Sequence, residues 1–358
     1  MDGAPIDNAM NDMHRPLNIA MTADPDLPVP PRLYGGAERL IDMLIRGMVA
    51  RGHAVTLFAH PESHTAATLV PYPGPSSLSR TSTLRNMLSV SGGVVGGGFD
   101  LVHSFGRIAY LLPLLPMTGL PKLMTYQREI TPSSVRWGHR LGRGSLHFSA
   151  ISQHMIAGVE KLAHWYQVYN GVPMDVYDFS PAVAADAPLV FLGRIEHIKG
   201  THLAIEIARR SGRRLVIAGN IPASETAYFE AQVKPHIDDD QVRYVGAVDD
   251  IQKNALLGAA AAFLMPILWE EPFGLVMAEA MACGTPVLGL RRGAVPEIVD
   301  DGVTGFVRDD VEGLVQCVSR LGEIDRLACR RAAEQRFSDD VIVDNYLAVY
   351  RQMLAVSK

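Results

Sequence analysis

The sequence predicts an α/β protein with two doubly wound parallel sheets, and three observations lead to this prediction. Its 358 residues suffice for two domains of ordinary size. Buried strands alternate with amphipathic helices in two successive runs, separated by a segment rich in proline and small residues. The composition, 48% hydrophobic and 20% charged, is that of a globular chain and excludes a disordered or fibrous one.

The first run begins with a βαβ unit. A strand is expected at residues 17–22, a proline-rich loop at 24–36 and a helix at 37–51, whose apolar residues recur at helical spacing. Gly52 stands where a helix C-cap belongs. The continuous apolar segment 54–59 is typical of a strand buried in a parallel sheet, so the three elements together predict a crossover unit.

The run continues less regularly to about residue 170. Further strands are expected at 100–103, 122–126, 148–151 and 167–169. Residues 71–98 are rich in Pro, Ser and Gly and are expected to form a long mobile connection. The glycines in that segment precede a strand instead of following one, so they do not predict a phosphate-binding loop.

A linker is expected at residues 173–185, which divides the chain into domains at 1–172 and 186–337. After it, a helix is expected at 201–210, and strands are expected at 189–192, 215–218, 242–245, 262–265 and 287–290. Residues 338–358 contain a last helix. In such sheets ligands bind at the carboxyl ends of the strands, so the strand-to-helix loops are the places to look for chemistry.

Charge and cysteine content limit the classes of function. The net charge of −5 argues against a nucleic-acid binder that works through overall positive charge. Residues 1–175 hold 14 basic and 12 acidic side chains, so the first half is the better surface for an anionic partner. The cysteines are odd in number and lack CxxC spacing, which predicts neither disulfides nor a zinc knuckle: Cys283, Cys317 and Cys329.

No targeting segment is expected. Residues 1–14 are polar and acidic and do not resemble a signal peptide. The most apolar stretch, 101–120, is interrupted by charged residues, proline and glycine, and is not expected to span a membrane. The sequence therefore predicts a cytoplasmic protein.

The strongest chemical signal lies at residues 269–286. A loop with Glu270 and Glu271 leads into a helix that ends near Gly284. The first-turn amides, aided by the helix dipole, can bind an anion. Glu271 and Glu279 are separated by up to roughly 12 Å along a helix, which suits the two ends of an extended ligand. The alternative is a solvated helix with no ligand.

Two weaker signals accompany it. At Gly193 a strand ends, and Arg194 and Lys199 follow in a loop before a helix. An arginine fork and a lysine point charge suit a diphosphate, although solvated loop cations are the alternative. Gly35 and Gly36, after Tyr34, allow a ligand to approach the backbone between the first strand and the first helix.

Together these segments resemble, in order and spacing, the retaining glycosyltransferases with the GT-B fold, a family that includes sucrose synthase and the bacterial mannosyltransferases. The resemblance covers nearly the whole chain. The Glu-x7-Glu segment is its most specific part, and residues 169–172 support it. It implies two Rossmann-like domains facing a central cleft. The first takes the acceptor and the second the nucleotide-sugar, and the last helix crosses back to the first.

The resemblance also implies roles for individual residues. Glu279 would bind the ribose, Glu271 the hydroxyls of the donor sugar, and Arg194 and Lys199 the diphosphate. Glu271, Arg194 and Lys199 are therefore the catalytic candidates. The remaining donor-binding candidates are Gly35, Gly36, Gly193, Val248, Phe273, Gly274 and Leu275. No cofactor is expected, and the co-substrate would be a nucleotide-sugar, UDP- or GDP-linked.

One position departs from the family pattern. Many members carry a histidine at the end of the strand that corresponds to residues 122–126, where this chain has Gln127 and Arg128. His103, at another strand end, is a second candidate for the acceptor or the donor sugar. The alternative for His103 is a structural residue beside the sheet. Gln127 can hydrogen-bond a hydroxyl but cannot shuttle a proton.

Two further segments bear on metal binding and on contact with a membrane. Asp24-Pro25-Asp26 matches a DxD metal motif, but it lies in a proline-rich loop and the family needs no metal, so no metal site is expected. Residues 128–143 are basic around Trp137, which suits either an anionic acceptor or peripheral contact with a lipid surface. A solvated helix face is the alternative.

The expected function is thus metal-independent transfer of a sugar, with retention of configuration, from a nucleotide-diphosphate donor to an unidentified acceptor. The acceptor is a small molecule, a glycan or a lipid-linked molecule, and no nucleic acid is involved. Two alternatives stay open. One is a coupling enzyme or isomerase on the same fold, and the other is a catalytically silent partner that binds nucleotide-sugar.

Overall fold

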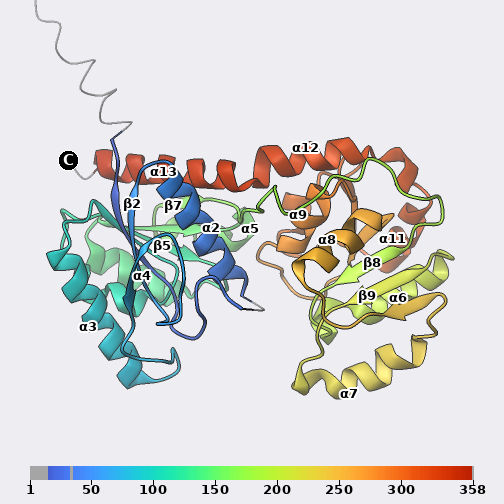
Figure 1. Ribbon diagram of the computed structural model, residues 1–358, viewed down its shortest axis with the longest axis horizontal. Helices are drawn as coiled ribbons and strands as arrows, with labels where there is room; N and C mark the ends of the chain where they lie inside the picture. Colours follow the sequence, from blue (N-terminus) through green and yellow to red (C-terminus); the bar gives the residue numbers. More distant parts are fainter. Residues whose placement is uncertain (1–14, 33–34, 357–358) are drawn as a thin grey trace, which may run out of the picture. The chain divides into compact units, whose positions relative to one another are not determined.

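The computed structural model describes residues 15–32 and 35–356. The segment considered as a signal peptide, and Tyr34, lie outside the described residues. The chain forms two compact units (Figure 1). The N-terminal unit extends to Ile151, resumes at 156–168 and is completed by the C-terminal helix from Ile342 onward, while residues 152–155 and 169–341 form the C-terminal unit.

The N-terminal unit contains a seven-stranded sheet in the order β3-β2-β1-β4-β5-β6-β7, in which every pair of neighbouring strands is parallel. Its elements are β1 (Asn18–Thr22), α2 (Gly36–Ala50), β2 (Ala54–Ala59), β3 (Thr68–Pro71), α3 (Arg80–Gly96), β4 (Leu101–Ser104), η1 (Ile108–Leu114), β5 (Lys122–Tyr126), α4 (Pro132–Gly142), β6 (Leu146–Ala150), η2 (Glu160–Leu162), β7 (Trp165–Gln167) and α13 (Asp339–Val356).

The alternation of side chains along each strand assigns the helices to the two faces of this sheet. A Cβ on Gly93 of α3 would lie 2.7 Å from Phe58 of β2, so α3 covers the face to which Phe58 points. Gly138 of α4 packs against Ile108 of η1, which continues the same layer. α2 and α13 pack together on the other face, where Gly47 meets Val343.

The C-terminal unit contains a six-stranded parallel sheet in the order β10-β9-β8-β11-β12-β13. Its elements are α5 (Gln153–Ile156), β8 (Leu189–Leu192), η3 (His197–Lys199), α6 (Thr201–Arg210), β9 (Leu215–Ala218), η4 (Ala223–Glu225), α7 (Thr226–Tyr228), η5 (Phe229–Val233), η6 (Lys234–His236), β10 (Val242–Tyr244), α8 (Asp250–Ala259), β11 (Ala262–Met265), α9 (Leu275–Ala282), β12 (Val287–Leu290), α10 (Val295–Ile298), β13 (Gly305–Arg308), α11 (Val311–Val318), η7 (Leu321–Glu323) and α12 (Arg326–Phe337). The prediction of two doubly wound α/β domains is confirmed.

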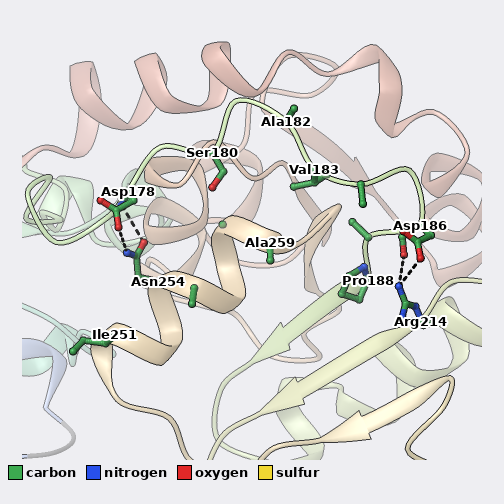
Figure 2. Close-up of a pocket in the computed structure, with 14 residues that line it drawn as sticks. Asp178, Ser180, Ala182, Val183, Asp186, Pro188, Arg214, Ile251, Asn254 and Ala259 are labelled. Atoms are coloured by element: carbon green, nitrogen blue, oxygen red, sulfur yellow. Dashed lines mark hydrogen bonds and ion pairs between the residues drawn. The ribbon is translucent and has the colours of Figure 1, made fainter.

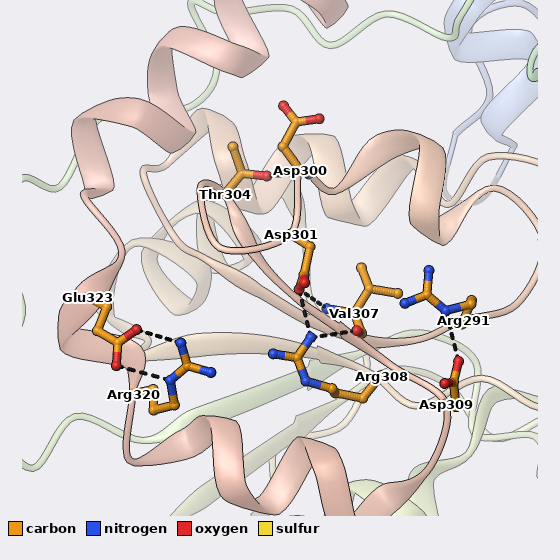
Figure 3. Close-up of polar contacts among 9 residues, drawn as sticks. All are labelled: Arg291, Asp300, Asp301, Thr304, Val307, Arg308, Asp309, Arg320 and Glu323. Carbon is orange, nitrogen blue, oxygen red and sulfur yellow. Dashed lines mark hydrogen bonds and ion pairs between the residues drawn. The ribbon is translucent and has the colours of Figure 1, made fainter.

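Charged side chains protect β13, the edge strand of the second sheet (Figure 3). Asp301 accepts hydrogen bonds from the Val307 amide at 2.9 Å and from Arg308 at 2.8 Å, and Arg291 pairs with Asp309 at 2.8 Å. Burial by itself would raise the pKa of Asp301, but these two donors lower it on balance. A charged edge of this kind discourages pairing with strands of other molecules.

The structure corrects one expected segment. Residues 71–98, predicted to be a mobile connection, contain the helix α3, which the N-cap Ser79 begins by accepting a hydrogen bond from the Ser82 amide. Its glycines and serines give low helix propensity, so composition alone favoured a loop. Burial of Val90 and Val94 in the layer beneath stabilises the helix instead.

All three cysteines are buried and free, in agreement with the absence of a disulfide framework: Cys283, Cys317 and Cys329. Burial raises the pKa of the Cys283 and Cys329 thiols to about 12. Such thiols are protonated and inert at neutral pH.

Candidate functional site

The carboxyl ends of β8 and β9 approach each other so closely that only glycine fits at Gly219. A Cβ there would lie 1.8 Å from the Gly193 carbonyl oxygen. Gly200, which caps α6, is constrained in the same way by the Pro266 carbonyl, 2.0 Å from its Cβ position. Gly193 differs, because the nearest heavy atom to its own Cβ position in the described chain is 3.9 Å away. Packing therefore does not explain the glycine at position 193.

Lys199, Trp269 and Glu271 meet beside this strand end. The Lys199 Nζ donates to Glu271 Oε2 at 2.7 Å, and Trp269 Nε1 donates to the same oxygen at 3.1 Å. The ammonium group also lies 4.8 Å from the centre of the Trp269 ring. The β8–α6 loop and the β11–α9 loop position these side chains, and a hydrogen bond from the Leu268 amide to the Ile198 carbonyl joins the two loops.

Arg194 lies in the same β8–α6 loop. Its guanidinium pairs with Glu196 Oε1 at 2.9 Å and is partly exposed. The other carboxylate oxygen of Glu196 is buried and has no hydrogen-bond partner among the described residues. Glu196 therefore holds Arg194 on one side, at the carboxyl edge of the second sheet.

The backbone of Glu271 is anchored as firmly as its side chain. Its carbonyl accepts a hydrogen bond from the Ala294 amide at 2.8 Å. A Cβ on Gly293 would lie 2.2 Å from the Glu271 nitrogen, so the loop after β12 packs directly against this residue. Preorganisation of this kind fixes the carboxylate before any ligand binds.

Glu279 is buried on α9 and is held by two donors from other segments. Tyr177 Oη and Lys253 Nζ each lie 2.7 Å from its Oε1. Burial, followed by the negative charge of Glu279, raises the pKa of Tyr177 far above its usual value, so the phenol remains a donor. Only Oε1 receives these two bonds.

The N-terminus of α9 has the geometry expected of an anion site, but Phe273 does not contribute its side chain. Gly274 adopts a left-handed conformation with φ 77° and caps the helix, which begins at Leu275. The first amide bonded within the helix is that of Met277, to the Gly274 carbonyl at 2.9 Å. The ring of Phe273 is buried against Tyr169, so only its backbone is left for a ligand.

Val248 contributes to an apolar pocket of about 330 Å³ between α8 and the strands β8 and β9. Val190, Val216 and Val245 also line it. A larger pocket of about 610 Å³ lies between residues 178–188 and α8 (Figure 2). It includes none of the expected donor-binding residues, and its polar groups Asp178 and Asn254 are already paired with each other.

In the N-terminal unit, Gly35 is the N-cap of α2 and Gly36 is the first residue of that helix. No heavy atom of the described chain lies within 4 Å of a Cβ built on Gly36. A Cβ on Gly35 would lie 2.7 Å from Glu38 Oε2. Gly35 is therefore constrained by its neighbours, whereas Gly36 is not.

Asp24, which follows β1, is a buried carboxyl that sequence reasoning assessed only as part of a metal motif. Burial raises its pKa to about 6, against the opposing charge of Arg107, and Arg128 opposes it as well. Its Oδ1 is buried without a hydrogen-bond partner among the described residues. No group of three or more metal-ligating side chains occurs in residues 15–32 and 35–356.

His103 does not face a substrate, which corrects its assignment as a site candidate. It is fully buried, with Nδ1 2.5 Å from Tyr350 Oη of α13 and Nε2 2.6 Å from Thr125 Oγ1. Burial holds its pKa well below the usual value. Both ring nitrogens are used inside the core, so His103 is the structural residue that the alternative described.

Gln127 and Arg128 follow β5, where the family histidine would stand. Gln127 is half-buried and Arg128 is exposed. The charge of Arg128 acts on both Asp24 and Glu38. These side chains and Asp24 therefore occupy one edge of the N-terminal sheet.

Sequence reasoning missed Trp269, Tyr177 and Lys253. Trp269 is the first residue of the recognised segment 269–286, but the pattern assigned it no role. Tyr177 and Lys253 are 102 and 26 residues from Glu279 along the chain, and nothing in their local sequence connects them with it. Only the fold brings them to that carboxylate.

Comparison with known proteins matches each unit to a glycosyltransferase model. Residues 187–323 match the family described as "Glycosyl transferases group 1", and residues 34–176 match "Glycosyltransferase Family 4". Glycogen synthase of Mycobacterium tuberculosis (strain CDC 1551 / Oshkosh) is 34% identical over 190 residues, which cover 50% of this chain and 45% of that protein. D-inositol 3-phosphate glycosyltransferase of Mycobacterium bovis (strain BCG / Pasteur 1173P2) is 30% identical over 213 residues, which cover 52% of this chain and 43% of that protein. Each match thus spans less than half of the curated relative.

Solved structures share the fold over almost the whole chain. A glycosyltransferase involved in avilamycin A biosynthesis is 26% identical with a TM-score of 0.70, covering 95% of this chain and 98% of its own. A sucrose-phosphate synthase from Thermosynechococcus elongatus is 20% identical with a TM-score of 0.76, covering 95% and 100%. Anabaena HepE in complex with UDP and glucose is 18% identical with a TM-score of 0.71, covering 93% and 99%. Each of the two units thus matches a glycosyltransferase domain model, and the solved structures show that the chain has the GT-B fold.

Proposed function

We propose that the protein transfers a sugar from a nucleotide-diphosphate donor to an acceptor, with retention of anomeric configuration and without a metal ion. The convergence of Lys199, Trp269 and Glu271 beside Gly193 carries this proposal. It joins a cation, a carboxylate and an unobstructed stretch of backbone at the carboxyl edge of a parallel sheet, where such folds bind nucleotides. The UDP and glucose bound by Anabaena HepE are in keeping with such a donor.

The two cations of the β8–α6 loop are assigned to the diphosphate. As the bond between sugar and phosphate breaks, negative charge develops on the leaving diphosphate, and Arg194 and Lys199 stabilise that charge without reorganisation. Lys199 is already oriented by Glu271 at 2.7 Å, so little rotamer entropy remains to be lost. The amides at the start of α9, at Gly274 and Leu275, add partial positive charge.

The two glutamates are assigned to the two ends of the donor. Glu271 would accept hydrogen bonds from hydroxyls of the sugar, and its Oε1 receives no hydrogen bond from Lys199 or Trp269, which both use Oε2. Glu279 would accept from the ribose, with Tyr177 and Lys253 holding the carboxylate in position. Val248 and its neighbours are assigned to the base.

Retention follows from front-face attack in this proposal. The departing phosphate takes the proton of the acceptor hydroxyl. No protein base is then needed at the position where this chain has Gln127 and many family members have a histidine. Positive charge at the anomeric carbon resembles that of glycoside chemistry. Gln127, Arg128 and Asp24 in the N-terminal unit are the candidates for contact with the acceptor.

A thermal-shift panel tests the donor proposal. UDP, GDP, ADP and dTDP, each with its common sugars, are added with and without EDTA. A selective shift that EDTA does not change supports a metal-free diphosphate site. The absence of a shift with every nucleotide would contradict donor binding.

Product analysis then separates transfer from the two alternative functions. Mass spectrometry of the reaction detects a glycosylated acceptor if the proposal holds, whereas an isomerase leaves the mass of the donor unchanged. Tight donor binding with no transfer or hydrolysis across an acceptor panel would favour a silent binding partner. The anomeric configuration of the product, read by NMR coupling constants, tests retention.

A further inference from the structure

Helix α3 exposes an apolar stripe. Leu84, Leu88 and Val95 are spaced at four and seven residues and therefore share one face of the helix. They are 52%, 59% and 65% exposed, and Leu78, just before the helix, is 88% exposed. Val90 and Val94 on the other face are buried. The helix thus has two apolar faces, and only one of them has a partner in the described structure.

The neighbouring elements continue this surface. η1 packs against both α3 and α4, so the three form one layer of the N-terminal unit. Leu112 and Met117 are exposed in and after η1, and Trp137 and Leu141 lie one turn apart on α4, with Trp137 61% exposed. Eight of the sixteen large apolar side chains that are exposed in the described residues lie between positions 78 and 141. Single exposed apolar side chains are ordinary, but such a concentration marks an interaction surface.

The charge of the same segment is strongly one-sided. Residues 78–144 contain eight Lys and Arg and two Asp and Glu, in a chain of net charge −5. Neither α3 nor α4 contains an acidic residue. Every arginine of the segment is exposed, whereas Lys122 is buried: Arg80, Arg85, Arg107, Arg128, Arg136, Arg140 and Arg143.

We propose that the layer of α3, η1 and α4 binds the surface of an anionic lipid bilayer. Trp137 and the exposed leucines would lie at the level of the headgroups, where amphipathic and apolar side chains gather. The arginines would pair with lipid phosphates while their aliphatic stems lie along the apolar surface. The proposal is independent of the transferase reaction and concerns where the protein works.

Charge favours a bilayer over a second copy of this chain. In a symmetric dimer the same surface of both molecules would meet, which would bring two sets of arginines together without acidic partners. An anionic bilayer supplies the complementary charge over the whole surface. It also accommodates apolar side chains without a matching shape.

Vesicle sedimentation tests the proposal with the full-length protein. Vesicles of phosphatidylcholine alone are compared with vesicles of equal parts phosphatidylcholine and phosphatidylglycerol. We expect binding to the anionic vesicles only, weakened by high salt. The double variant R136Q/R140Q is expected to lower the partition coefficient roughly tenfold or more. The double variant L84S/L88S is expected to lower it by a similar factor.

Matched variants in the C-terminal unit control for these changes. I251S/V303S removes two exposed apolar side chains, and R214Q/R331Q removes two exposed arginines. Both are expected to bind vesicles as the unaltered protein does. Tryptophan emission should shift to the blue with anionic vesicles, and W137F should lose that shift while Trp165 and Trp269 remain.

Several outcomes would overturn the proposal. The proposal fails if the unaltered protein binds neither kind of vesicle or binds both equally. It also fails if both surface variants still bind the anionic vesicles as the unaltered protein does. Light scattering that shows a dimer of the unaltered protein and a monomer of L84S/L88S would assign the surface to a second copy instead. Transfer to a soluble acceptor, assayed without vesicles, is expected to be unchanged in both surface variants.

Discussion

Lys199 and Glu271 form an ion pair of 2.7 Å although 72 residues separate them in the chain. The pair joins the loop after β8 to the loop after β11, and these strands are neighbours in the second sheet. Both side chains are largely buried, and the Trp269 indole covers the ammonium group on one side. A cation and a carboxylate are thereby fixed at one point of the sheet edge, and the predictions about the reaction start from this pair.

Replacement of Lys199 by Ala is expected to lower turnover by about 10²–10³-fold, because one fixed electrostatic stabiliser contributes that much. It also leaves the Glu271 carboxylate without its cation, so the melting temperature should fall. K199A/E271Q should regain the melting temperature but not the turnover. K234A, which breaks an exposed pair with Glu230, is the control and should alter neither quantity. Near-normal turnover of K199A would remove Lys199 from the catalytic residues.

Replacement of Glu279 by Gln is expected to weaken nucleotide binding ten- to hundredfold, since a charge-assisted hydrogen bond is worth about 1.5–3 kcal/mol. Calorimetric titration with the nucleoside diphosphate measures the change. Y177F, which removes one of the two donors to Glu279, should weaken binding by a smaller factor because Lys253 still holds the carboxylate. Unchanged affinity of E279Q would exclude contact with the ribose.

Alanine substitutions at three glycines distinguish positions that contact the ligand from a position that is constrained by packing. G193A and G36A are expected to fold with normal melting temperatures, because their Cβ positions are free of close contacts in the described chain. Both should raise the donor KM, since the added methyl group occupies space assigned to the ligand. G219A is the contrast, because its Cβ would lie 1.8 Å from a carbonyl oxygen, and it should destabilise the fold. Normal kinetics in both G193A and G36A would contradict close approach of the donor.

Removal of the Asp24 carboxylate is predicted to stabilise the folded protein and to weaken binding of the acceptor. Its pKa of about 6 in the folded protein exceeds the ordinary 3.8, so the folded state binds more protons between these values and stability falls as pH rises through that range. D24N should therefore be more stable at pH 7.5, by up to about 3 kcal/mol, with a flatter pH profile of unfolding. If the carboxylate contacts the acceptor, KM for the acceptor rises in D24N while donor affinity is unchanged. Lower stability of D24N at pH 7.5 would contradict the raised pKa.

His103 is predicted to stabilise the fold and to play no direct part in the reaction. H103A leaves Thr125 and Tyr350 without their shared partner and creates a cavity, at a cost of about 2–5 kcal/mol of unfolding free energy. The folded pKa is depressed, so the contribution of His103 is complete above pH 6.5 and is lost as pH falls below it. Denaturant titrations at pH 5 and 7.5 measure both effects. A tenfold loss of kcat in fully folded H103A would return His103 to the site.

Most strands and helices, and the loops that hold the candidate site residues, follow from local sequence. The apolar segments 189–192 and 262–265 had to be buried strands because every position is apolar, and parallel sheets are covered on both faces. Glu271, Lys199 and Gly193 were found because each lies in a loop between a strand and a helix, which is where such sheets bind ligands. These are properties of short segments, so a sequence pattern can predict them.

The contacts of each polar side chain depend on the packing of segments that are distant in the sequence. Tyr177 and Lys253 converge on Glu279 because distant segments pack together, and His103 is removed from the site by a tyrosine of the last helix. Helix α3 forms because Val90 and Val94 are buried, against the preference of its glycines and serines for a loop. Hydrogen bonds and burial depend on neighbours in space, and a linear pattern specifies neighbours only along the chain.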